Sequence, residues 1–365
     1  MTYEDLPKFV CDDIHFNGRE IRGYDLPFNL IYSEREAGKS TFMYKTIWDY
    51  FRETGNASIL VRRRSADITE QFITDIGTVY EKFTGERPAF QYKLSSMKDG
   101  MLDIYLCGQI FIRVHSLSVP VARQKSLVLR NVQYLFYDEF CVNTLYKERY
   151  LPGEMMALFE LRKTYMREAP DKKNGEKKFY VYCLANPYSY YTPFTSEFQV
   201  DINLLKPGVL IHGDVWAVQC YQICDELKEK ILKSDPLFRM NSTYTDYAMK
   251  GIAINDTRFR IIRNQPKSFQ LRYCFKLHGK ILGIFSGIDL DSNIFYWTKI
   301  LDKDNISKRR DIVCYDFGDM IPNRTILDEN GRKNYSKLRG CIRYQQVAHF
   351  SAEEAAMLEE IFQLM

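Results

Sequence analysis

Short apolar runs alternate with helical patterns through the first half of the chain. Each run is nearly all apolar and four to six residues long, which fits a strand that is covered on both faces. Residues 39–52 place Phe42, Met43, Ile47 and Phe51 on one helical stripe, and residues 153–167 also have helical character. Strands that alternate with helices predict an α/β fold with a central, mostly parallel sheet. The predicted strands are residues 27–32, 58–61, 132–137 and 179–184, and residues 103–114 are predicted as a hairpin that turns at Cys107-Gly108.

The second half of the chain has a different character. A strand is predicted over residues 209–219 and a helix over residues 221–234. From residue 268, three apolar stretches separated by turns predict a β meander, and Ser351 with Glu354 forms a capping box that opens a C-terminal helix. We therefore predict two domains joined by a small module. The predicted parts are residues 1–205, the connecting module 206–255, and residues 256–365.

Composition narrows the class of protein. Of the 365 residues, 45% are apolar, which is enough for a sizeable core. The nine cysteines include no C-x-x-C pair, so neither a disulfide framework nor a zinc site is expected. No stretch approaches the roughly 18–20 apolar residues that span a bilayer, and the acidic N-terminus is unlike a signal peptide, so we expect a soluble, intracellular protein without a membrane partner. The net charge is only +4, so any nucleic-acid surface must be local.

A phosphate-binding pattern lies where the first predicted strand meets the first predicted helix. The usual P-loop is G-x-x-x-x-G-K-[ST], and here the G-K-S is intact while Ser33 replaces the first glycine. In such a loop the backbone N–H groups hold phosphate, Lys39 adds a positive charge, Ser40 ligates Mg²⁺ and Gly38 permits close approach. A chance G-K-S-T at a helix start is the alternative. The residues expected at the nucleotide are Ser33, Glu34, Arg35, Glu36, Ala37, Gly38, Lys39, Ser40 and Thr41.

Two acids complete the predicted site. The run at 132–137 leads directly into Asp138 and Glu139, and ligands of open α/β sheets bind at the carboxyl ends of strands. Asp138 is predicted to hold Mg²⁺, and Glu139 to orient and polarise the attacking water. Asn186 follows another strand and is predicted beside Glu139, although it also suits the start of the turn before Pro187. A solvated acidic pair is the alternative for Asp138 and Glu139, but together with Lys39 they predict hydrolysis of Mg-ATP.

These segments, taken together, resemble the DNA-packaging ATPases of small φ29-like podophages, a branch of the terminase motor group in the additional-catalytic-glutamate (ASCE) class of P-loop proteins. The resemblance covers most of the chain, and its specific part is the ATPase motifs. The matching segments are Ser33–Ser40, Val61-Arg62-Arg63, Ser116–Val119, Gln124-Lys125-Ser126, Tyr137-Asp138-Glu139-Phe140, Leu151-Pro152-Gly153-Glu154, Arg167 and Leu184-Ala185-Asn186.

The resemblance implies further roles for single residues. Arg167 corresponds to an arginine finger that acts across a subunit boundary, and Lys125 to a second trans-acting cation. Asn186 corresponds to the residue that switches the catalytic Glu139. A surface arginine is the alternative for Arg167, since Arg162 and Lys163 are equally cationic. The chain departs from the family pattern at Ser33 and in a longer loop at 168–178.

Further predictions concern the DNA contacts and the C-terminal part of the chain. A packaging motor grips the phosphate backbone and ignores sequence, so a few basic residues per subunit suffice. The DNA-contact candidates are Arg62, Arg63, Arg64, Lys147 and Arg149, of which Arg62–Arg64 alternatively serve the nucleotide site or a subunit interface. The resemblance implies an RNase H-like α+β fold at the C-terminus. Because residues 280–286 contain no acid and Asp289 and Asp291 lie beyond them, we predict that its nuclease is vestigial.

The resemblance also implies the partners and setting of the motor. They are double-stranded DNA, the capsid portal (connector) and identical subunits in a ring, five in this family, in the host cytoplasm and transiently docked on the procapsid. The sequence gives neither the subunit number nor whether a structural RNA joins. Three other functions remain open: a terminase large subunit with an active nuclease, a nucleotide-binding assembly protein that does not hydrolyse ATP, and a ring helicase.

Overall fold

The computed structural model forms two compact units, which are described separately. One comprises Met1–Val142, Glu154–Pro187 and Lys206–Ile252, and the other comprises Asn143–Gly153, Tyr188–Leu205 and Ala253–Met365. The structure describes residues 2–93, 100–119, 129–143, 148, 150–190, 192–234, 260–261, 270–277, 280–288, 294–301, 314–316, 347–349 and 351–364.

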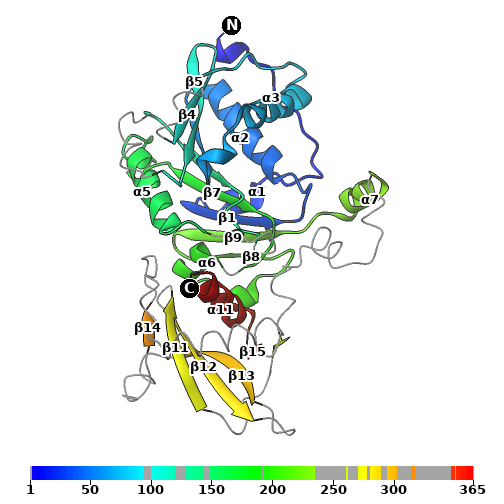
Figure 1. The fold of residues 1–365 in the computed structure, drawn as a ribbon. Coiled ribbons are helices and arrows are strands. Elements are labelled where there is room, and N and C mark those ends of the chain that lie inside the picture. The colour runs from blue at the N-terminus through cyan, green and yellow to red at the C-terminus, as the bar shows by residue number, and fades with distance from the viewer. Residues whose placement is uncertain are drawn as a thin grey trace. The chain divides into compact units, whose positions relative to one another are not determined.

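A large sheet forms the centre of the first unit (Figure 1). Its nine strands run in the order β3-β4-β5-β2-β6-β7-β1-β9-β8, and the six from β5 to β9 are parallel to one another. The mostly parallel sheet predicted from the apolar runs is therefore confirmed, as is the hairpin of β4 and β5. The strands are β1 Phe28–Ser33, β2 Ser58–Arg62, β3 Gln91–Tyr92, β4 Met101–Leu106, β5 Gln109–Ser116, β6 Tyr134–Asp138, β7 Tyr180–Ala185, β8 Leu210–His212 and β9 Trp216–Tyr221.

Helices cover both faces of this sheet. On one face lie α1 (Arg19–Arg22), α2 (Lys39–Thr54) and α3 (Glu70–Thr84), and the other face is covered by α5 (Glu154–Met166) (Figure 1). Successive strand residues serve the two layers, since Phe136 packs against Phe42 of α2 while Tyr137 bonds to Glu154 of α5. The predicted stripe of α2 is buried in this core.

The sheet extends past residue 205, where the connecting module was predicted to begin. Strands β8 and β9 lie within that predicted module, yet β9 pairs in parallel with β1 from Phe28↔Trp216 to Ser33↔Tyr221. Burial explains the pairing, because Ala217, Val218 and Cys220 are almost completely inaccessible to solvent. Helix α7 (Asp225–Ser234) follows β9.

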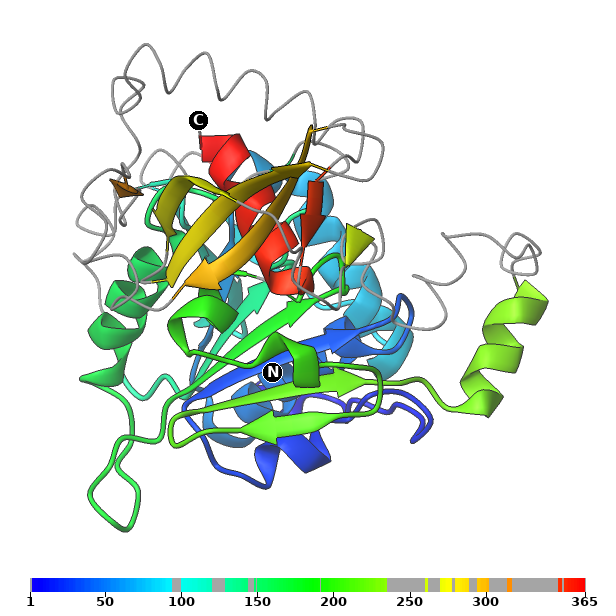
Figure 2. The same cartoon turned by 90° about the horizontal axis from the view of Figure 1, so that it is seen from below.

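The second unit contains a six-stranded sheet in the order β10-β15-β13-β12-β11-β14, with α11 (Ala352–Leu364) packed along it (Figure 2). The predicted meander is confirmed as the antiparallel strands β11, β12 and β13. Ser351 caps α11 as predicted, but the Glu354 carboxylate accepts from the Ile300 N–H at 2.9 Å and so ties the helix to β13. The strands are β10 Arg260–Ile261, β11 Gln270–Leu277, β12 Lys280–Ile288, β13 Ile294–Leu301, β14 Cys314–Asp316 and β15 Val347–His349; the unit also holds the short helix α6, Pro193–Glu197.

Candidate nucleotide site

Four parallel strands bring the candidate residues to one edge of the large sheet. Register pairs Val61 with Tyr137, Asp138 with Leu184 and Tyr32 with Ala185, so β2, β6, β7 and β1 all end there. The P-loop follows β1 at this same edge. The topology thus assembles the predicted P-loop and the predicted acid pair at the carboxyl edge, where open α/β sheets bind ligands.

Backbone geometry in the P-loop requires glycine at residue 38 but not at residue 33. Gly38 has a φ of 96°, and a Cβ there would lie 2.7 Å from the His15 Cβ. Ser33 is outside the left-handed region, and its hydroxyl instead accepts a hydrogen bond from Lys39 Nζ at 2.9 Å. The Phe16 N–H donates to the Ala37 carbonyl at 2.8 Å and braces the loop from outside.

The Lys39 ammonium is buried and folded back onto its own loop. Its Nζ donates to the carbonyls of Ser33 at 3.0 Å and Glu34 at 2.9 Å, and to Asn186 Oδ1 at 2.9 Å. Burial lowers the pKa of Lys39 to about 8, although the carboxylates of Asp138 and Glu34 oppose the shift. Lys39 and Asp138 therefore share one electrostatic environment, as the predicted site requires.

Arg62 holds both predicted acids. Its Nη1 lies 3.2 Å from Asp138 Oδ2 and its Nη2 lies 3.0 Å from Glu139 Oε2. Asp138 is 19% exposed whereas Glu139 is 69% exposed. Burial raises the pKa of Asp138 to about 6, with Arg62 opposing and Glu139 adding to the rise. The sequence predicts Arg62 at the DNA, with the nucleotide site or a subunit interface as alternatives, and in the structure Arg62 contacts the two predicted acids.

Asn186 lies at Lys39, where its Oδ1 accepts from Nζ. Its predicted role as the residue that switches Glu139 stays a prediction. In this arrangement Asn186 helps to hold the ammonium that would contact phosphate.

Glu34, one of the loop residues expected at the nucleotide, is buried in a way that the sequence did not predict. Its side chain is completely buried, and neither carboxylate oxygen has a partner at hydrogen-bond geometry among the described residues. Burial raises the pKa of Glu34, which the nearby N–H groups of Glu34 and Ile223 and the Lys39 charge offset only in part. An acid in a P-loop gives no sequence signal for this burial, because the loop itself is polar.

Of the predicted site residues that the structure describes, Arg63, Arg64 and Arg167 make no described contact with Lys39 or the acid pair. Arg167 directly follows α5 and is exposed, and the neighbouring Glu168 carbonyl accepts from the Asn131 N–H just before β6 begins. Arg63 is engaged with Glu154 and is 11% exposed, so Arg64 alone of the three adjacent arginines has an exposed side chain. Lys125, Lys147 and Arg149 lie outside the described residues, as do Asp289 and Asp291.

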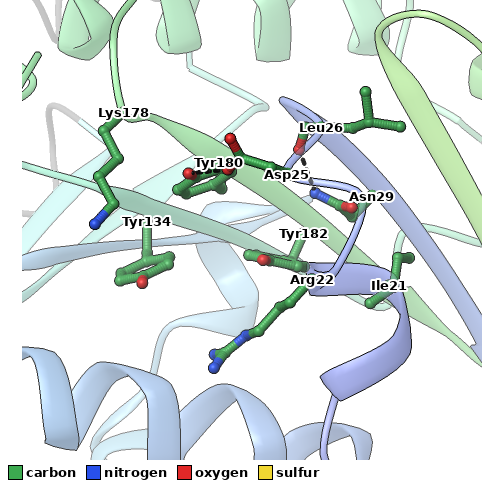
Figure 3. A pocket seen from close by; sticks show the side chains of 9 residues that line it. All are labelled: Ile21, Arg22, Asp25, Leu26, Asn29, Tyr134, Lys178, Tyr180 and Tyr182. Carbon is green, nitrogen blue, oxygen red and sulfur yellow. Dashed lines mark hydrogen bonds between the residues drawn. The ribbon is translucent and has the colours of Figure 1, made fainter. Parts of the chain in front are cut away.

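A cavity of about 130 Å³ lies at the opposite, amino edge of the sheet (Figure 3). Tyr134 and Tyr180, the first residues of β6 and β7, line it with Asn29 near the start of β1. Tyr180 donates to Asp25, which also pairs with Lys172. This cavity is separate from the nucleotide site. Its lining residues are Ile21, Arg22, Asp25, Leu26, Asn29, Tyr134, Lys178, Tyr180 and Tyr182.

The donor set at the carboxyl edge suits magnesium together with phosphate. Ser40 and Asp138 offer hard oxygen ligands, and Mg²⁺ usually takes one or two protein oxygens, phosphate oxygens and water. Among the described residues, no three or more His, Cys, Asp or Glu side chains gather into a site that would bind metal without phosphate. Separately, no described helix is long and apolar enough to cross a membrane.

The P-loop, the acid pair at the end of β6 and the mostly parallel sheet together define a P-loop ATPase. Within that class, residues 11–350 match the family of podovirus DNA encapsidation proteins (Gp16), and the chain belongs to this family. It is a DNA-packaging motor ATPase related to terminases.

Two solved structures share the fold over almost the whole chain. One, from the genome-packaging motor assembly of bacteriophage Phi-29, is 17% identical, with 97% of this chain and 100% of that chain covered and a TM-score of 0.61. The other, from the Phi-28 gp11 packaging motor, is 16% identical, with 97% and 98% covered and a TM-score of 0.58. Among curated proteins, none matches the sequence significantly.

Proposed function

We propose that this ATPase binds Mg-ATP between Lys39 and the Asp138-Glu139 pair and uses its hydrolysis to move double-stranded DNA into a viral procapsid. The observation that carries the proposal is the convergence of a buried P-loop lysine and two carboxylates at one sheet edge in a member of a DNA encapsidation family. Phi-29 and Phi-28 relatives are packaging motors by their own descriptions.

Binding would exchange internal partners for phosphate. Lys39 leaves the carbonyls of Ser33 and Glu34 and pairs with phosphate oxygens, while loop N–H groups and the start of α2 hold the same phosphates. Bound Mg²⁺, with Ser40 and Asp138 as ligands, would supply positive charge against the developing phosphate charge. Proton uptake at Lys39 is favoured, since phosphate restores the charged form that burial disfavours.

Arg62 would keep the site inactive until nucleotide arrives. Its guanidinium forms ion pairs with Asp138 and with Glu139, the residue expected to orient the attacking water. Glu139 can serve the water only after this pair opens. A positive φ of 58° at Glu139 and its high exposure leave its side chain at the open rim of the site. Asn186, which bonds to Lys39, would sense the same exchange and complete the switch of Glu139.

Arg167 would act on the nucleotide of a neighbouring subunit. Asn131, which contacts Glu168, lies seven residues before Asp138, and at about 3.3 Å per extended residue the two sheet edges are roughly 20 Å apart. An arginine side chain does not span that distance, so within one chain Arg167 cannot reach the phosphates. Ring assembly brings the amino edge of one subunit to the carboxyl edge of the next, with Lys125 as a second cation. Hydrolysis would then depend on the neighbour.

The remaining assignments extend the proposal to assembly. We propose a homomeric ring, with five subunits as in the family, that docks on the capsid portal in the host cytoplasm and grips the DNA phosphates through Arg64, Lys147 and Arg149. The part from residue 256 would be an RNase H-like domain whose nuclease is vestigial, and the chain that follows β9 would connect it to the ATPase domain. A structural RNA remains an optional partner.

The test measures DNA- and procapsid-dependent phosphate release and DNA packaging by wild type, Lys39→Ala and Glu139→Gln. Glu139→Gln should retain nucleotide binding and lose about 10²–10⁴-fold in turnover, as expected for loss of a general base. Lys39→Ala should lose nucleotide binding itself. Undiminished hydrolysis by Glu139→Gln contradicts the assignment of the base, and ATP binding without hydrolysis by wild type would instead favour the assembly-protein alternative. Metal-dependent DNA cleavage that is lost in Asp289→Asn would favour the large-terminase alternative. Unwinding of a forked duplex would favour the helicase alternative.

A further inference from the structure

Two consecutive arginines at the end of β2, Arg62 and Arg63, form ion pairs on opposite faces of the large sheet. Arg62 pairs with Asp138 and Glu139, and its guanidinium lies 5.4 Å from the centre of the Phe72 ring on α3. Arg63 pairs with Glu154 on α5, on the opposite face of the sheet. Adjacent strand residues point to opposite faces, so a shift of the strand end moves both arginines together.

Glu154, in the first turn of α5, accepts hydrogen bonds from residues at the ends of β2 and β6. Its Oε2 accepts from Arg63 Nε at 3.0 Å, and its Oε1 accepts from Arg63 Nη2 at 3.2 Å and from the Tyr137 hydroxyl at 2.5 Å. Arg63 Nη2 also donates at 2.7 Å to the carbonyl of Phe140, the residue after the catalytic glutamate. Glu154 is 1% exposed, so this bidentate pair is shielded from water and salt. One carboxylate therefore joins β2, β6 and the first turn of α5.

Helix α5 runs from this carboxylate to Arg167. Its 13 residues span about 20 Å, and Arg167 directly follows the last of them. The buried side chains of Leu158 and Leu161 fix the helix against the sheet, and near its far end the Tyr165 hydroxyl lies 2.7 Å from His115 Nε2. A helix packed in this way moves as a body, so a displacement of its first turn reaches its last.

We propose that Glu154, held by Arg63 and Tyr137, is a positioning residue that couples the nucleotide state of a subunit to the placement of its own Arg167 at the neighbouring site. This inference rests on the proposed function, in particular on the action of Arg167 in trans. When Mg-ATP binds, Asp138 would pair with its Mg²⁺ and Arg62 would separate from Asp138 and Glu139. The ends of β2 and β6 would then rearrange. Arg63 and Tyr137 pass that rearrangement to Glu154, and α5 carries it to Arg167.

Mixed rings test the coupling, because they separate the subunit that holds nucleotide from the subunit that donates the arginine. The holder carries Arg167→Ala and keeps an intact nucleotide site. The donor carries Glu139→Gln and keeps an intact Arg167. Each variant alone should be nearly inactive, and their mixture should hydrolyse ATP wherever a donor arginine meets a holder site. This mixture is the baseline for the changes at Glu154.

Glu154→Gln is then introduced into the donor alone. We expect the activity of the mixture to fall at least tenfold, while ATP binding by the donor changes less than twofold. Glu160→Gln, the same substitution at an exposed position of the same helix, should leave the mixture at its baseline activity. A role of Glu154 confined to its own nucleotide site would show the reverse pattern, with loss only when Glu154→Gln is in the holder, and that pattern overturns the inference.

A second donor guards against misfolding. Glu154→Gln leaves the buried Arg63 without its full countercharge, which is strongly destabilising, whereas replacing both partners by apolar residues often is not. A donor with Arg63→Met and Glu154→Leu should therefore fold, as judged by its unfolding temperature, and should show the same loss of activity in the mixture. Baseline activity with this folded donor overturns the inference. Failure of the parent mixture to hydrolyse ATP would overturn trans action itself, before Glu154 is changed.

Discussion

The two edges of the large sheet carry different chemistry. At the carboxyl edge, Lys39, Asp138, Glu139 and Arg62 converge, and burial moves the pKa values of Lys39 and Asp138 toward neutrality. At the amino edge lies a small cavity lined by tyrosines (Figure 3). The exposed Arg167 follows α5 near this edge, where the neighbouring Glu168 carbonyl accepts from the Asn131 N–H. Under the proposed function, the charges that exchange partners with a nucleotide lie at the first edge. The charge proposed to serve another subunit is exposed and lies near the second edge.

Removal of the exposed cation should have the largest effect. Arg167→Ala is expected to lower turnover in the assembled motor about 10³–10⁵-fold, because an arginine finger stabilises charge in the transition state. Nucleotide affinity of the free subunit should stay unchanged, since Arg167 is remote from its own site. Phosphate release and ATP titration measure the two quantities. Lys163→Ala, at an exposed cation in the last turn of α5, is the matched control, and an equal loss there would contradict the assignment.

Titration of Asp138 and Lys39 at the carboxyl edge should make the affinity for Mg-ATP depend on pH. Below about pH 6 binding must displace a proton from Asp138, and above about pH 8 it must supply one to Lys39. Affinity should therefore be highest between these values and fall by up to tenfold per pH unit outside them. Calorimetry in buffers of different ionisation enthalpy counts the protons. Asp138→Asn should weaken binding and remove the acidic limb, and an unchanged acidic limb would implicate another group.

Glu34 should limit stability rather than catalysis. Burial raises the pKa of Glu34 in the folded protein above its unfolded value of about 4.5. The protonated side chain therefore contributes favourably to the free energy of unfolding below about pH 4.5. This contribution is lost as the pH rises through the folded pKa. Glu34→Gln should therefore stabilise the nucleotide-free protein at pH 7.5 by about 1–3 kcal/mol and much less at pH 4.5. Urea unfolding at the two pH values checks the sign. A pH-independent difference would mean that the pKa of Glu34 is the same in the folded and the unfolded protein.

The smallest effect is expected at the amino edge. Tyr180→Phe removes one hydrogen bond to Asp25 and should cost about 1 kcal/mol of stability. Mg-ATP affinity should not change, because the cavity lies across the sheet from Lys39. A change in affinity above threefold would show that the two edges are coupled within one subunit.

Local patterns sufficed to find the parts of the site. The apolar runs predict the strands, and the order of strand, G-K-S and helix, with two acids after a later strand, predicts the ATPase. The pairing of Arg62 with those acids did not follow, because it joins residues that are 76 and 77 positions apart through space. Residues 209–219 were predicted as one strand of a separate module, whereas they contain β8 and most of β9, two antiparallel strands of the large sheet. Apolar spacing does not say where such a stretch turns or which sheet it joins.

The most direct measurement uses an ATP analogue with a photoreactive aryl azide on its γ-phosphate, followed by mapping of the labelled peptides. For the free subunit the account predicts label in the peptides that contain Lys39 and Asp138. In the assembled motor it predicts additional label around Arg167, on a subunit whose own site carries Lys39→Ala and therefore binds no analogue. Label at the tyrosines of the amino-edge cavity in place of the P-loop would contradict the account.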